Sequence, residues 1–200
     1  NWTLPTPSAF TDEEIAAVKE WVEGGGSLLL IADHMPFPGA AEKLAAAFDV
    51  TLNNGFAVTP DPAGMADPFV FRRADGSLAD DPIAQGRAGA SVDSVATFTG
   101  SAFRAGPNAK PLLVLGPDTI SLMPDTAWQF QAATPRLPVG GWYQGAAIPV
   151  GQGRVAVFGE AAMFTAQVAP NGERFGMNAP AASGNAPFLL NVVHWLTAVD

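Results

Sequence analysis

Three side chains that could act together as acids, bases or metal ligands follow two apolar segments of the sequence. Asp33 and His34 come directly after segment 27–32, and Glu160 follows segment 154–158 after a single glycine. Both segments have the nearly uninterrupted apolar character of buried parallel strands. Ligands of open α/β sheets bind beyond the carboxyl ends of such strands. We therefore predict that Asp33, His34 and Glu160 meet in one small polar site.

Three interpretations of this trio are open. As metal ligands, the two carboxylates and the imidazole would hold a divalent ion that activates water and polarises an ester or phosphoryl oxygen. Without a metal, His34 would be a general base oriented by Asp33 or Glu160, with water or Ser101 attacking the substrate. In the third interpretation, Asp33 caps the following helix, Glu160 caps the turn after its strand, and His34 is a polar residue near the sheet edge.

Ser101 is the serine that we retain as a candidate nucleophile. It follows Thr99 and Gly100 at the end of a predicted strand over 92–98, and the chain has no Gly-x-Ser-x-Gly elbow. Its alternative role is a turn hydroxyl bonded to nearby backbone. His194, the second histidine, lies in an apolar segment, and we expect it to be buried and hydrogen-bonded rather than a ligand.

The composition excludes several classes of function. Nineteen acidic against ten basic residues give a net charge of −9, which opposes binding to nucleic acid or to anionic membrane surfaces. The absence of cysteine excludes disulfides, zinc–thiolate sites and thiol nucleophiles, and it favours an extracytoplasmic compartment, periplasmic or secreted. No apolar run approaches the ~20 residues that span a bilayer. The glycine-rich segments match no nucleotide-binding motif.

Helices and strands alternate around the candidate site. A capping box formed by Thr11 and Glu14 predicts the start of a helix, which glycines 24–26 end before the strand over 27–32. A second helix is predicted over 39–48. Further elements are strands over 92–98, 111–116, 145–150 and 154–158, a hairpin turn over 151–153, and a final helix over 186–198. This order predicts one three-layer α/β domain over 1–200 with a mostly parallel sheet and helices on both faces.

Two segments depart from this alternation. Residues 59–90 are rich in Pro, Gly and Asp, which predicts a long loop with one strand at 69–71. Residues 1–10 contain two prolines and few apolar residues, so we predict no strand before the first helix. We expect the first strand of the natural domain to be absent from this chain.

The capping-box helix and three further segments resemble uncharacterised domains of the class I glutamine amidotransferase-like superfamily, of the gliding-motility type linked to ABC-transporter accessory proteins. These segments are 24–34, 151–160 and 185–196. The resemblance covers most of the chain and implies a flavodoxin-like sheet flanked by helices, with its first strand before Trp2. Amidotransferases carry a cysteine on a sharp strand-to-helix elbow, where this chain has Asp33 and His34. Cysteine-dependent glutamine hydrolysis is therefore excluded.

Two functions of different classes remain. The first is a small hydrolase of carboxylic or phosphate esters that uses Asp33, His34 and Glu160, with or without a divalent metal, and segment 59–90 as a mobile lid. The second is a noncatalytic amidotransferase-like module that binds a ligand or a partner protein in an envelope or transport assembly. The superfamily resemblance favours the second. A partner protein or a second copy would pair with an open sheet edge beside residues 28–31.

Overall fold

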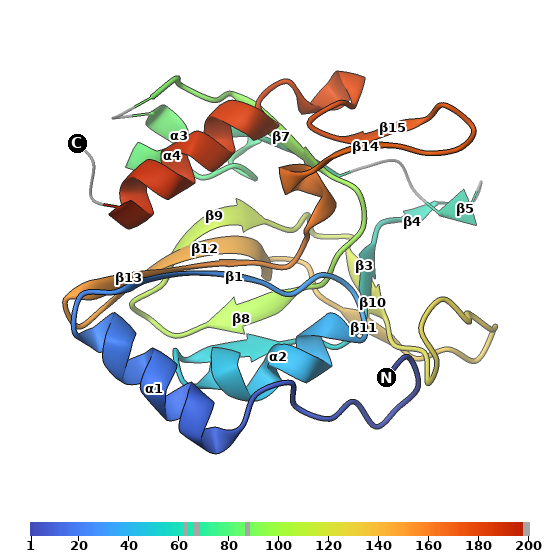
Figure 1. Ribbon diagram of the computed structural model, residues 1–200. Helices are drawn as coiled ribbons and strands as arrows, with labels where there is room; N and C mark the ends of the chain where they lie inside the picture. Colours follow the sequence, from blue (N-terminus) through green and yellow to red (C-terminus); the bar gives the residue numbers. More distant parts are fainter. Residues whose placement is uncertain (62–63, 66–68, 87–88, 198–200) are drawn as a thin grey trace.

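The main sheet of the protein is mixed. A computed structural model describes residues 1–61, 64–65, 69–86 and 89–197 (Figure 1). Within these residues six strands form the main sheet in the order β1-β13-β12-β8-β2, and β9 also pairs with β12. The strands are β1 (Ser27–Ile31), β2 (Val50–Leu52), β8 (Phe103–Ala105), β9 (Lys110–Val114), β12 (Tyr143–Val150) and β13 (Gly153–Phe158).

Helices pack on both faces of this sheet. In Figure 1, α1 (Asp12–Glu23) and α2 (Phe37–Ala46) lie below it, and α4 (Asn185–Thr197) lies above it beside the short α3 (Pro82–Gln85). The side chains of β13 alternate between two apolar cores. Val155 and Val157 pack into the core on the side of α1 and α2, whereas Ala156 and Phe158 pack into the core on the side of α4. This alternation follows from the two-residue repeat of a strand.

The remaining strands form smaller sheets at the periphery. Strands β3 (Phe56–Val58), β10 (Ile120–Leu122) and β11 (Arg136–Pro138) pair in the order β11-β10-β3. The two-stranded pairs are β4 (Pro60–Asp61) with β5 (Gly64–Met65), β6 (Phe69–Arg72) with β7 (Ser94–Thr97), and β14 (Ala166–Val168) with β15 (Arg174–Gly176). Short 3₁₀ helices are η1 (Arg73–Asp75), η2 (Ala162–Phe164) and η3 (Pro180–Ala182).

The predicted three-layer α/β fold with a flavodoxin-like, mostly parallel sheet is wrong, because the described residues form a strand-rich fold of mixed, mainly antiparallel sheets. In the described part of the chain only β1 and β13 pair in parallel in the main sheet, and its other pairs are antiparallel. Parallel neighbours require a crossover of a dozen or more residues, usually a helix. The described elements from β8 to β13 are all strands, and the turn at Gly151 reverses the direction of the chain between β12 and β13. Consecutive strands joined in this way run antiparallel.

The segment predicted as a long loop contains more structure than expected. Between residues 59 and 90 the structure has β6, as the sequence predicted, together with β4, β5, η1 and α3. Residues 62–63, 66–68 and 87–88 of the proposed lid lie outside the described residues. No described helix combines the length and the apolar character that crossing a bilayer would require.

Candidate functional site

Two of the predicted site residues, Asp33 and Glu160, lie near each other beyond neighbouring strand ends. Strands β1 and β13 pair in parallel, with Ile31 opposite Phe158, so the residues after each strand emerge at the same edge of the sheet. Burial, and then the negative charge of Asp33, raise the pKa of Glu160 to about 8. The strand register therefore places Asp33 and Glu160 at the same edge of the sheet, and a shared functional site at this edge stays a prediction.

Both carboxylate oxygens of Glu160 are used within its own turn. The side chain is 1% exposed. Its Oε1 accepts a hydrogen bond from the Ala162 amide at 2.7 Å, and its Oε2 accepts one from the Met163 amide at 2.7 Å. These bonds cap η2 and oppose the rise in the pKa of Glu160, but the effect of burial is larger. No ion pair from the described residues neutralises this carboxyl group.

His34 does not join the carboxyl groups. Its backbone amide donates to Asp33 Oδ1 at 2.7 Å, while its Nδ1 donates to the carbonyl oxygen of Met35 at 2.7 Å. The imidazole stacks on Phe56 with ring centroids 4.7 Å apart and meets the edge of Trp128 at 4.6 Å. Asp33 does not cap α2, because the N-cap position of that helix is Pro36, without a side-chain hydrogen bond.

Ser101 fastens the ends of β1 and β13 together. Its side chain is fully buried, its hydroxyl donates to the Ala32 carbonyl at 2.9 Å, and its amide donates to the Gly159 carbonyl at 2.6 Å. The neighbouring Gly100 has a φ of 93°, and a Cβ there would lie 2.3 Å from the Gly159 oxygen. The segment that crosses the strand ends therefore requires glycine at position 100, and the Ser101 hydroxyl faces backbone rather than solvent.

A buried amide next to this crossing was missed in the sequence. Gln144, in β12, is fully buried. Its Oε1 accepts from the Thr97 hydroxyl at 2.7 Å, and its Nε2 donates to the Thr99 carbonyl at 2.9 Å. A glutamine beside the apolar residues of a strand was the available signal, because a buried amide must find partners within the protein. Gln144 holds the segment before Ser101 against the sheet.

The predicted trio does not form a metal-binding group. Throughout the described ranges, no cluster of three or more His, Cys, Asp and Glu side chains is placed to hold a metal ion. The imidazole of His34 packs in an aromatic cluster, and the oxygens of Glu160 accept backbone hydrogen bonds. The arrangement corresponds most closely to the third interpretation, with the correction that Asp33 bonds within its own turn.

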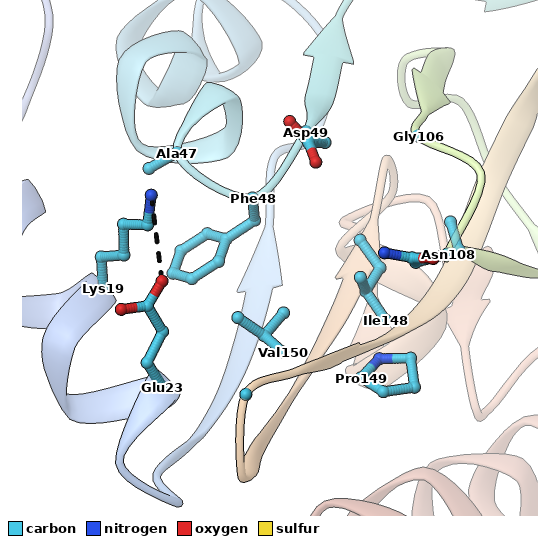
Figure 2. A pocket seen from close by; sticks show the side chains of 12 residues that line it. Lys19, Glu23, Ala47, Phe48, Asp49, Gly106, Asn108, Ile148, Pro149 and Val150 are labelled. Atoms are coloured by element: carbon cyan, nitrogen blue, oxygen red, sulfur yellow. Dashed lines mark ion pairs between the residues drawn. The ribbon is translucent and has the colours of Figure 1, made fainter.

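A cavity lies at the opposite end of the same strands. Its volume is about 240 Å³, and Phe48, Ile148 and Val150 form much of its apolar lining (Figure 2). On its rim, Lys19 Nζ lies 3.9 Å from Glu23 Oε1 (Figure 2). The rim lysine is therefore already paired with a carboxylate. The cavity is also remote from Asp33 and Glu160, so it adds nothing to the predicted site.

An exposed aromatic surface is the second feature that the sequence did not reveal. Trp2, Phe37 and Trp128 are 53%, 46% and 45% exposed, respectively, and we refer to these three residues as the aromatic surface. The ring of His34 lies between Phe37 and Trp128 and contacts both. Because the three aromatic residues come from distant parts of the sequence, no local spacing could indicate that they meet.

Comparisons with known proteins give a fold but no family. No family model matches the chain, and no curated protein matches its sequence. Among solved structures, the mmIFT52 N-terminal domain superposes with a TM-score of 0.63 at 16% identity, covering 96% of this chain and 73% of that one. A ThuA-like protein from Bacteroides uniformis superposes with a TM-score of 0.51 at 12% identity, covering 98% and 68%. At these identities the likeness shows a shared fold alone.

Proposed function

We propose that this protein is a noncatalytic binding module that receives an extended strand of a partner polypeptide along the outer edge of β1. The observation that carries the proposal is the position of β1 at the edge of the main sheet. Across the described residues β1 pairs with β13 alone. An unpaired strand edge presents a row of backbone donors and acceptors that a further strand can satisfy.

The hydrogen bonds of β1 identify the groups that face outward. The Ala32 amide donates to the Phe158 carbonyl at 2.8 Å, and the Gly26 carbonyl accepts from the Arg154 amide at 3.2 Å. In a parallel ladder, alternate residues direct both their N–H and their C=O toward the same neighbour. The even-numbered residues of this segment therefore face β13, whereas the backbone groups of Leu29 and Ile31 face away from it.

Strand β1 lacks the features that usually protect an edge. Its sequence, Ser-Leu-Leu-Leu-Ile, contains no charged residue and no proline, and its register with β13 has no bulge. The opposite edge strand, β2, is three residues long, with Thr51 exposed. Long apolar edges promote uncontrolled pairing unless another strand covers them. The edge of β1 is thus suited to a specific extended partner.

The geometry of the predicted catalytic residues also favours a module over an enzyme. Glu160 and Ser101 are buried and hydrogen-bonded to backbone, and the His34 ring packs among aromatic side chains. A nucleophile or general base has to reach a substrate atom. The superfamily resemblance supports the same proposal and suggests an envelope or transport assembly as the setting.

Hydrogen exchange of the free protein tests the open edge. We expect the amides of Leu29 and Ile31 to exchange at least about a hundredfold faster than those of Leu28 and Leu30, because the inner amides open only when β1 leaves the sheet. Two-dimensional NMR in D₂O resolves these residues. Equal protection of all four amides would mean that the outer edge is already covered.

A strand peptide with N-methylated backbone tests the binding mode. The probe is an eight-residue peptide of alternating Val and Thr, compared with two versions methylated at alternate amides on one edge or on the other. Pairing with β1 uses one edge of the peptide. Only the version that is methylated on that edge should therefore fail to bind and fail to protect the Leu29 amide from hydrogen exchange. Equal binding of both versions would refute strand pairing. Protection of Leu29 that rises with protein concentration, without peptide, would identify a second copy as the occupant.

A hydrolase stays the alternative prediction. For a noncatalytic module we expect no turnover of p-nitrophenyl acetate, p-nitrophenyl butyrate or p-nitrophenyl phosphate above the uncatalysed rate in buffer, with or without EDTA. Turnover that EDTA removes would support the metal-assisted hydrolase, and turnover that survives EDTA but is lost in Glu160→Gln would support acid–base catalysis.

A further inference from the structure

The aromatic surface is one continuous patch rather than three isolated rings. The ring centroids of Trp2 and Phe37 lie 6.1 Å apart, those of Phe37 and His34 5.9 Å, and those of His34 and Trp128 4.6 Å. The neighbouring planes are steeply inclined, at 81°, 62° and 74°. Contiguous exposed aromatic surface on a soluble domain is typical of a binding site.

Backbone hydrogen bonds hold the patch in place. The Leu4 amide donates to the Asp125 carbonyl at 2.8 Å, and the Ala127 amide donates to the Trp2 carbonyl at 2.8 Å. The N-terminal segment and the segment that carries Trp128 are thereby joined side by side. The backbone segments that carry Trp2 and Trp128 are therefore held together before any ligand arrives, which reduces the entropy that binding would cost.

Trp128 is held in an unfavourable backbone conformation. Its φ is 66°, in the left-handed region that a bulky side chain rarely adopts. Such a conformation is unfavourable and persists where the surrounding structure enforces it, often at ligand sites. Glycine would adopt this conformation without strain. The presence of tryptophan at a position suited to glycine points to a use for the indole.

The side-chain charges in the segments that form the patch are negative. The segments that contribute the aromatic surface, 1–6, 33–38 and 123–130, carry the carboxylates Asp33 and Asp125 and no lysine or arginine. The Asp125 side chain is exposed, and the whole chain has a net charge of −9. An aromatic face attracts cations through its quadrupole, and the exposed carboxylate of Asp125 adds to that attraction. The ligand that suits this patch is therefore cationic.

The protein itself shows how a guanidinium packs on tryptophan. The Arg104 Cζ lies 4.1 Å from the ring centroid of Trp142, and the Arg154 Cζ lies 5.5 Å from that of Trp195. A planar, weakly hydrated guanidinium can stack on an indole and still donate hydrogen bonds to a carboxylate, whereas a lysine ammonium is a compact, strongly hydrated charge. Arginine is thus the better match to exposed indoles with carboxylates nearby.

We infer that the aromatic surface binds an arginine-bearing polypeptide segment, with a guanidinium stacked on Trp128 or Trp2 and hydrogen-bonded to Asp125. Arginine and tryptophan are also the residues that most often dominate the binding energy of protein interfaces. The inference goes beyond the proposed function, because it concerns the side chains of the aromatic surface and not the backbone groups of the β1 edge.

The test compares two peptides on the intact protein. The probes are acetyl-Gly-Arg-Gly-Arg-Gly-amide and the same peptide with lysine in place of arginine, followed by the NMR shifts of the indole Nε1–H groups. We expect saturable binding of the arginine peptide that shifts Trp2 and Trp128, at least about fivefold weaker binding of the lysine peptide, and loss of affinity as salt rises.

Variants locate the binding. Trp128→Gly removes the ring while relieving the positive φ, so the protein should stay folded, and Phe37→Ala removes a neighbouring ring. Each substitution should weaken the binding of the arginine peptide by about tenfold. Trp21→Ala, which removes an indole that is 55% exposed on α1, is the matched control and should leave affinity unchanged. Equal binding of the two peptides, equal loss in the Trp21 variant, or no binding at millimolar peptide would each overturn the inference.

Discussion

The free energy of unfolding should fall as the pH rises from about 5 to 8, and the substitution Glu160→Gln should remove most of that fall. Burial raises the pKa of Glu160 from 4.5 to about 8 in the folded protein. In the unfolded chain the pKa of Glu160 has its ordinary value. The folded state therefore binds the proton more tightly. The resulting stabilisation is complete below the unfolded pKa and is lost as the pH rises through the folded pKa.

The expected size follows from the shift in the pKa of Glu160. Each unit corresponds to about 1.4 kcal/mol, so the stability difference between pH 4.5 and pH 8 reaches up to about 5 kcal/mol. The pKa values of the exposed Asp75 and Asp80 are shifted in the opposite direction, downward, mainly by hydrogen bonds with Ser77 and Gln85. Their stabilisation is lost only below about pH 4. Between pH 5 and 8, Asp75 and Asp80 therefore do not contribute to the change in the free energy of unfolding that we assign to Glu160.

Urea unfolding at several pH values measures this effect. Glutamine offers one acceptor to the two amides of Ala162 and Met163, so the variant should be less stable than the parent by about 1–3 kcal/mol at pH 5. It should match or exceed the parent at pH 8. The exposed Glu173→Gln is the control and should keep the parent's pH dependence. A Glu160→Gln protein with the same pH slope as the parent would show that Glu160 is ionised when folded.

The substitution Asn185→Asp should destabilise the protein by about 3–5 kcal/mol at pH 7. Asn185 begins α4 and is fully buried. Its Oδ1 accepts from the Ala96 amide at 2.9 Å, and its Nδ2 donates to the carbonyls of Ala96 at 2.7 Å and Met163 at 3.1 Å. Aspartate would bring a buried negative charge against two carbonyl oxygens, which leaves both acceptors unpaired.

Urea unfolding at pH 7 also measures this loss. The control is Asn108→Asp, the same chemical change at an exposed position, which should alter stability by less than about 0.5 kcal/mol. The penalty at residue 185 should shrink as the pH falls, because a protonated carboxyl can donate one hydrogen bond. Similar unfolding midpoints for the two variants would contradict the role assigned to Asn185.

Elements with local signals were predictable from the sequence. The capping box places the Thr11 amide 2.8 Å from Glu14 Oε2, and the Glu14 amide 3.2 Å from the Thr11 hydroxyl, as the spacing indicated. The hairpin turn at 151–153 also joins β12 to β13 as predicted. Strand direction in the rest of the sheet was not predictable from apolar segments, because it depends on how each strand is connected to the next.

The candidate site was also only partly predictable from the sequence. Asp33 and Glu160 were expected at one edge because each follows a strand of the same sheet, and the parallel pairing of β1 with β13 places both there. The direction of the His34 ring could not be predicted, because Phe56 and Trp128 hold it from distant segments. The burial of Ser101 could not be predicted either, because it depends on how the segment around Gly100 packs against Gly159 across the strand ends.

The position of β1 has a consequence for the order of folding. Its ladder with β13 joins Ser27 to Arg154, residues far apart in the sequence, whereas β12 and β13 form a local hairpin. Non-local pairs form late because a long loop must close before they contribute stability. We therefore expect β1, with the adjoining α1, to join the sheet last and to detach first. A polypeptide bound along its outer edge would slow that detachment, so occupancy of the edge would set the kinetic lifetime of the native state.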